Sequence, residues 1–180
     1  GYMYIDDVIK SMLSILDESN ENKIYREVYP MYDVTLGDLV EKIRAFDESR
    51  RNLKIPNLTN RFDQSLYATY LSYLDKSNWE YTLDIKTDNR GCLAEFIKSD
   101  SFGQIFVSRT KPGITRGNHY HHTKIEKFFV IEGDAIIRLR SIINKSEIIE
   151  FRISGKDMKV VNIPPGYTHS IENVGNTELI

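Results

Sequence analysis

Three histidines and one glutamate in this sequence have the types and the spacing of a metal site. His119 and His121 are separated by one residue, so on a β-strand both imidazoles would project from the same face and meet one cation. Glu126 follows closely enough to begin the returning strand, and His169 comes later, after the turn over residues 164–166. Three imidazoles and one carboxylate suit zinc, iron, manganese, nickel or copper, and the ligand types alone do not select one of them.

The alternative is that these histidines are ordinary exposed or hydrogen-bonded residues on strands. Of the four histidines in the chain, only His122 falls outside the pattern, and by strand parity it points to the opposite face. That concentration of histidines at ligand positions favours the metal site.

The spacing of apolar residues, which predicts the elements that position these ligands, changes near residue 80. Before that point, apolar residues recur at helical spacing, which predicts helices over about residues 8–16, 36–46 and 62–74. Asp6 or Asp7 is expected to cap the first helix, and Thr35 with Asp38 forms the capping box of the second.

Beyond Trp79, apolar and polar residues alternate, most clearly over residues 104–108, 137–140 and 149–153, with turn signals between the runs. Many short strands without long intervening helices indicate a sandwich or a barrel. The predicted fold class is therefore α+β, with a mostly helical part over residues 1–80 and a β domain over residues 81–180. The first residues run straight into a helix and residues 178–180 stop as a strand begins, so we expect a fragment of a longer protein, truncated within the β domain.

The composition is that of an ordinary globular protein, with 180 residues, 41% hydrophobic and 28% charged. A net charge of −2 without a basic cluster argues against a nucleic-acid partner. Cys92 is the only cysteine, so no intrachain disulfide can form. Neither a membrane-spanning apolar run nor a signal peptide is present, which predicts a cytoplasmic protein without a membrane partner.

The metal residues also carry a family resemblance. The first motif of the cupin family is matched by Gly113, His119, His121, Glu126 and Gly133. Residues 164–173 resemble the second cupin motif around His169, although Met158 stands where that motif has its first glycine. The resemblance implies a double-stranded β-helix, or jelly-roll, barrel in which three histidines and one glutamate bind one metal: His119, His121, Glu126 and His169.

The preceding part resembles a different family. Residues 1–9 and 32–39 are similar to late segments of extended short-chain dehydrogenase/reductases, where an aromatic-Ile-Asp-Asp-Val run opens a helix of the substrate-binding part. The resemblance implies that residues 1–80 are a remnant of an α/β reductase domain. Residues 1–80 contain neither the Gly-rich phosphate loop nor the Tyr-x-x-x-Lys pair of that family, so we expect no cofactor-binding residues for NADPH in this chain.

Residues 88–96 and 115–120 are similar to segments of cupin-type dTDP-sugar 3,5-epimerases. A reductase remnant followed by such a cupin resembles the bifunctional capsular-polysaccharide enzymes of the UDP-N-acetyl-L-fucosamine pathway. The resemblance implies that the cupin epimerises C3 of a UDP-2-acetamido-2,6-dideoxy-4-hexulose. The full-length protein would then reduce C4 with NADPH to give UDP-2-acetamido-2,6-dideoxy-L-talose. It also implies a zinc ion and a homodimer.

The epimerases use a histidine equivalent to His119 as the base, but one imidazole nitrogen cannot both bind a metal and take a proton. We favour the ligand role for His119, which leaves the base open. The candidates are Lys111, Tyr120, Lys127 and Tyr167, each of which could equally be a solvated lysine or a packed tyrosine. Arg116 is a candidate partner for the nucleotide diphosphate or the enolate, with a surface ion pair as the alternative.

Two other functions remain open on the sequence. The same ligands would support a cupin dioxygenase if the metal were iron. Alternatively, the metal could be structural and the barrel a non-catalytic dimerisation module. Because one fold serves many functions, the barrel itself does not decide among these three hypotheses.

Overall fold

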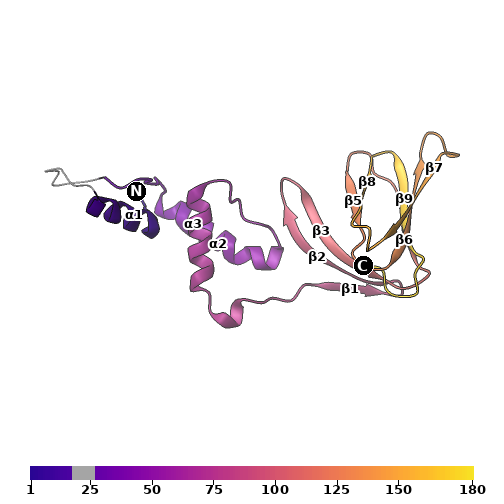
Figure 1. Ribbon diagram of the computed structural model, residues 1–180, viewed down its shortest axis with the longest axis horizontal. Helices are drawn as coiled ribbons and strands as arrows, with labels where there is room; N and C mark the ends of the chain where they lie inside the picture. The colour runs from indigo at the N-terminus through magenta and orange to yellow at the C-terminus, as the bar shows by residue number, and fades with distance from the viewer. Residues whose placement is uncertain (18–26) are drawn as a thin grey trace. The chain divides into compact units, whose positions relative to one another are not determined.

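The structure is a computed structural model that describes residues 1–17 and 27–180, and it divides them into two compact units. The first unit comprises Gly1–Thr82 and Lys98–Gly103, and the second comprises Leu83–Ile97 and Gln104–Ile180. The first unit holds the helices and the second holds most of the strands (Figure 1). The assignment of residues 1–80 to a reductase-like domain and of residues 81–180 to a truncated cupin stays a prediction.

Three helices form in the first unit, as the periodicity predicts. They are α1 (Ile5–Asp17), α2 (Leu36–Asn52) and α3 (Arg61–Tyr73), and a short 3₁₀ helix, η1 (Lys76–Asn78), follows them. The prediction that Asp6 or Asp7 caps α1 is wrong, because the helix already begins at Ile5 and both residues lie in its first turn. The buried Asp7 carboxylate instead pairs with Arg61 of α3.

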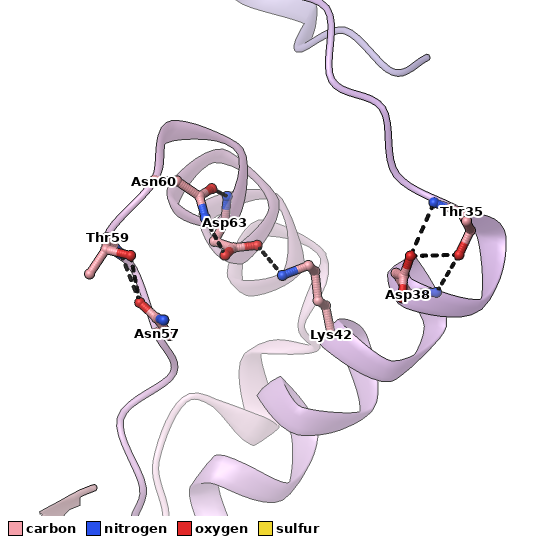
Figure 2. A network of polar contacts seen from close by, with 7 residues as sticks. All are labelled: Thr35, Asp38, Lys42, Asn57, Thr59, Asn60 and Asp63. Carbon is pink, nitrogen blue, oxygen red and sulfur yellow. Dashed lines mark hydrogen bonds and ion pairs between the residues drawn. The ribbon is translucent and has the colours of Figure 1, made fainter. Parts of the chain in front are cut away.

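Polar contacts fix where α2 and α3 begin (Figure 2). The predicted capping box is confirmed, since the Thr35 hydroxyl accepts a hydrogen bond from the Asp38 amide at 3.1 Å and the Asp38 carboxylate accepts one from the Thr35 amide. At the start of α3, the Asn60 side chain accepts from the Asp63 amide at 2.8 Å. The Asp63 carboxylate is also 2.7 Å from the Lys42 ammonium, so one carboxylate ties the two helices together.

The strands pair into three antiparallel groups. The first group has the order β1-β2-β3, with β1 (Ile85–Asp88), β2 (Gly91–Ser99) and β3 (Gly103–Thr110). The second has the order β4-β9-β6-β7, with β4 (Thr115–His119), β9 (Tyr167–Asn173), β6 (Asp134–Ser141) and β7 (Ile148–Ser154). The third pairs β5 (Glu126–Phe129) with β8 (Val160–Ile163). β6 is central, because it pairs with β7 on one side and with β9 on the other.

The apolar core of the second unit lies between the four-stranded and the two-stranded sheets. Ile137 and Leu139 of β6 pack in one buried cluster with Val161 and Ile163 of β8. Ile137 is fully buried, and the intervening arginines project outward, as the alternation predicts. Two facing sheets around one core make a β-barrel, so the predicted α+β class with a C-terminal barrel is confirmed. No helix in the described ranges is long and apolar enough to cross a membrane.

Candidate metal centre

The structure brings the four predicted ligands together within the barrel unit. His119 ends β4, Glu126 begins β5, His169 lies in β9, and His121 lies in the segment between β4 and β5. One ligand atom from each residue lies within 4.8 Å of the ligand atoms of the other three. The ring centroid of His119 is 4.6 Å from that of His169 and 5.1 Å from that of His121.

The pairing of β4 with β9 places His119. In this register His119 lies opposite His169, and the register shifts between Gly117 and His119. Gly117 has φ +97°, and a Cβ at this position would lie 2.7 Å from the His169 carbonyl oxygen. The two strands approach so closely here that only glycine fits. This close approach places the His119 side chain near the imidazole of His169.

His121 is placed by a different contact than the sequence suggests. The imidazoles of His119 and His121 do converge as predicted, but β4 ends at His119, so a continuous strand does not explain the position of His121. The carbonyl of His121 instead accepts a hydrogen bond from the Gly166 amide at 3.0 Å. The turn that precedes β9 therefore holds the loop carrying His121 beside the strand carrying His169.

The buried His169 has the protonation state that a metal ligand requires. It is only 2% exposed, and this burial is the main reason that its pKa lies below the ordinary value of 6.5, although the neighbouring Glu126 carboxylate acts in the opposite direction. A neutral imidazole has a free nitrogen lone pair to offer a metal. The Nε2 atom of His169 lies 2.8 Å from Oε2 of Glu126.

Glu126 is ionised for a different reason. Burial disfavours its charged form, but the hydrogen bond and charge of Lys124, together with the nearby histidines, hold its pKa below 4.5. The Lys124 ammonium lies 2.5 Å from Oε1, which leaves Oε2 beside Nε2 of His169. Lys124 was not predicted as a site residue. The signal available for it was its position two residues before Glu126, on the same face of an extended chain.

Two buried polar atoms test whether these residues fit a metal ion. Nε2 of His121 and Oε2 of Glu126 are both shielded from solvent, and neither has a hydrogen-bond partner among the described residues. Although Oε2 is close to His169, the geometry of that pair is not that of a hydrogen bond. Leaving a buried polar atom unpaired costs about 1–3 kcal/mol. A divalent cation would satisfy both atoms, so the donor set fits one with nitrogen and oxygen ligands.

The predicted catalytic candidates occupy different surroundings. Tyr167 lies two residues before His169 on β9, so the two side chains share a face, and Tyr167 packs against the core cluster. The Lys127 ammonium donates a hydrogen bond at 2.5 Å to the side-chain oxygen of Asn162 on the paired strand β8. Since Lys127 directly follows Glu126 on β5, strand alternation directs it away from the cluster.

The remaining candidates lie outside the cluster. The ring of Tyr120 contacts the ring of His122 at 5.2 Å, and Lys111 is exposed immediately after β3. Arg116 makes no ion pair among the described residues. Its guanidinium donates hydrogen bonds to the hydroxyl of Thr110 at 2.9 Å and to the carbonyl of Arg109 at 3.3 Å. These contacts tie the start of β4 to the end of β3.

Comparisons with known proteins agree with the capsule-related resemblance. The family described as "Polysaccharide biosynthesis C-terminal domain" matches residues 86–180. The chain is 35% identical over 178 residues to UDP-2-acetamido-2,6-beta-L-arabino-hexul-4-ose reductase of Pseudomonas aeruginosa, covering 99% of this chain and 48% of that protein. The chain therefore spans about half the length of this curated relative.

Solved structures give the same result for the fold. The capsular polysaccharide assembling protein CapF of Staphylococcus aureus superposes with a TM-score of 0.89 at 42% identity, over 98% of this chain and 48% of that one. CapF with the inhibitor 3-isopropenyl-tropolone superposes with a TM-score of 0.91, also at 42% identity, over 98% and 51%. The resemblance to capsular sugar-nucleotide enzymes that the sequence predicts is confirmed.

Proposed function

Because the chain belongs to the polysaccharide biosynthesis C-terminal domain family, we propose that its barrel is a metal-dependent C3 epimerase acting on a UDP-2-acetamido-2,6-dideoxy-4-hexulose. The observation that carries this proposal is the convergence of three imidazoles and one ionised carboxylate. Two of their atoms are buried and have no hydrogen-bond partner in the part of the chain that the structure describes. The name of the Pseudomonas aeruginosa relative supports the substrate class, since that protein is described as a reductase of a UDP-linked hexulose.

The proposal for the whole protein includes a second step. A reductase domain, of which residues 1–80 are the C-terminal, substrate-binding part, would reduce C4 with NADPH. The product would be UDP-2-acetamido-2,6-dideoxy-L-talose. The protein would act as a homodimer in the cytoplasm. Epimerisation by the barrel requires no net oxidation, so it can be assayed on this chain without NADPH.

The chemistry sets what the barrel must supply. The proton on C3 is acidic because the C4 ketone is adjacent, and epimerisation removes it from one face and returns a proton to the other. The C3–H electron pair passes into the enolate and returns to C3 when the new C–H bond forms. A zinc ion held by His119, His121, Glu126 and His169 would supply electrophilic stabilisation of negative charge. We propose zinc because the family resemblance implies it, and imidazole nitrogens and carboxylate oxygens are among its usual ligands.

Among the base candidates, we favour Tyr167 as the group that exchanges a proton with C3. It is the candidate that shares the face of β9 occupied by His169. Lys127 is engaged by Asn162 and directed away, while Lys111 and Tyr120 are exposed. Tyr167→Phe removes only the hydroxyl. We expect this variant to retain zinc and to lose at least about a hundredfold in exchange rate, since general acid–base catalysis contributes typically 10²–10⁴-fold.

The test is solvent exchange at C3. The zinc-loaded chain is incubated with the UDP-4-keto sugar in D₂O, and proton NMR follows the loss of the C3 signal. We expect deuterium incorporation, its abolition in Glu126→Gln, and its retention in His122→Asn, which changes the histidine outside the cluster. A folded, zinc-loaded chain that gives no exchange would refute the proposal. Stoichiometric iron with oxygen-dependent turnover would instead identify a dioxygenase.

A further inference from the structure

A second concave site lies in the helical unit, apart from the metal residues. It is a cavity of about 300 Å³, at the lower end of the range of roughly 300–1,000 Å³ typical of small-molecule sites. Its walls come from the end of α2, from α3, and from the segment over residues 74–81 that contains η1. The lining residues are Ser49, Arg50, Tyr67, Leu71, Leu74, Asn78, Trp79 and Tyr81.

The rim of this cavity presents aromatic faces held in place by polar contacts. Trp79 and Tyr81 are 66% and 49% exposed, which is high for residues of this size. The indole nitrogen of Trp79 donates a hydrogen bond to the carbonyl of Leu74 at 3.3 Å. The guanidinium of Arg50 lies 5.3 Å from the ring centre of Tyr81 and donates to the carbonyl of Glu80 at 3.0 Å. Each of the two exposed rings therefore contacts a polar group of the same unit.

The floor combines an apolar surface with unused hydrogen-bonding groups. Tyr67 packs on Phe46 with ring centres 4.9 Å apart and stacks on Tyr70, which orients its ring. In the described part of the chain, the side-chain hydroxyls and amide of Tyr67, Tyr81 and Asn78 make no hydrogen bond. Unused donors and acceptors around an aromatic-walled cavity favour a ligand that has an apolar face and polar edges.

We propose that this cavity binds the pyranose ring of a saccharide. The C–H face of such a ring packs on an aromatic face such as that of Trp79, and its hydroxyl edges can pair with the Tyr67 and Tyr81 hydroxyls, the Asn78 amide and the remaining N–H groups of Arg50. A planar nucleobase would use the aromatic face but has fewer edge groups for these partners. The site lies in the part that we propose to be the substrate-binding part of a reductase and rests on that proposal, but it does not depend on the epimerase activity, because none of its residues belongs to the barrel unit.

The chain contains its own probe for this site. Trp79 is the only tryptophan and lines the cavity, so intrinsic indole fluorescence reports most directly on the cavity. The 180-residue chain is titrated with N-acetylglucosamine, UDP-N-acetylglucosamine and UMP. We expect a saturable change with both sugar-bearing compounds and none with UMP. A change with UMP of the same size as that with the nucleotide sugar would overturn pyranose recognition, as would the absence of any change up to millimolar concentrations.

Variants separate binding from folding. Tyr67→Phe removes one hydroxyl and keeps the stacked ring, so we expect about a fivefold weaker affinity, the effect of one hydrogen bond of about 1 kcal/mol. Tyr73→Ala is the matched control, because Tyr73 also lies on α3 and is 86% exposed but does not line the cavity. Circular dichroism verifies that each variant folds. An equal loss of affinity in both variants would contradict the assignment.

Discussion

Gly117 gives the sharpest test of how the fold builds the metal centre. Its φ of +97° lies where side chains with a Cβ are rarely found, and its α-carbon faces the backbone of β9. In Gly117→Ala the new Cβ would lie 2.7 Å from the His169 carbonyl oxygen and 3.1 Å from the Ser170 α-carbon. Backbone atoms cannot rotate away as a flexible side chain can, so the two strands must separate or the chain must change conformation.

The magnitude follows from two contributions. A positive φ costs a residue with a Cβ about 1–2 kcal/mol. The clash adds to this, because 2.7 Å is well inside the 3.4 Å at which ordinary contact begins. We expect the free energy of unfolding to fall by about 2–4 kcal/mol in total. His119 and His169 face each other across the same pair of strands, so we also expect zinc affinity to fall at least about tenfold, as for other losses of ligand positioning.

Gly113→Ala is the matched control. Gly113 also has a positive φ, of +73°, but nothing lies within 4 Å of the position of its Cβ. This variant should therefore lose only the conformational contribution of about 1–2 kcal/mol and bind zinc nearly as the parent chain does. Urea denaturation of the zinc-free proteins measures stability, and competition with a chromogenic chelator measures zinc affinity. If both variants lost the same stability and bound zinc equally well, the close approach of β4 to β9 would not be what positions His119.

Three further outcomes follow from single contacts. Lys124→Met releases Oε1 of Glu126, so zinc affinity measured by chelator competition should fall about tenfold or more; unchanged affinity would exclude a positioning role. Asp88 has its pKa lowered to about 2, chiefly by its hydrogen bonds from Arg90, so its stabilising contribution is present above pH 3.8 and is lost as the pH falls toward 2. Arg90→Ala should raise the NMR titration midpoint of that carboxyl, and an unmoved midpoint would contradict the pairing. Thr35→Ala removes the cap of α2 and should destabilise the chain by about 1 kcal/mol in urea denaturation, whereas Thr35→Ser should not.

The metal cluster could be predicted from the sequence because its pattern is mostly local. His119, His121 and Glu126 fall within eight residues, and the turn predicted over residues 164–166 marks the start of the strand that carries His169. Strand parity nevertheless gave the wrong reason for the position of His121, since β4 ends before it and a backbone contact from the turn preceding β9 holds it. Periodicity describes an unbroken strand, and it carries no information about where a close backbone approach interrupts one.

The contacts of the remaining residues depend on tertiary structure that no local pattern encodes. Lys124 acquires its role only when the chain folds so that its ammonium reaches the Glu126 carboxylate, and Arg116 proves to hold β3 to β4 through neutral acceptors. Side-chain alternation along β5 directs Lys127 away from the metal cluster, but this could be inferred only once β5 was known to include both Glu126 and Lys127.

The aromatic cavity also depends on tertiary contacts that no local sequence pattern encodes. Tyr67 and Tyr70 of α3 form a packing surface with Phe46 of α2. The cavity arises because the chain after η1 returns Trp79 beside that surface, and no motif in the sequence marks this return. Since the cavity and the metal ligands belong to different units, stripping the metal should leave the Trp79 titration unchanged. If the fluorescence change caused by the saccharide disappeared when the metal was removed, the sugar would bind at the barrel. One titration, done with and without chelator, therefore assigns any observed binding to one of the two sites.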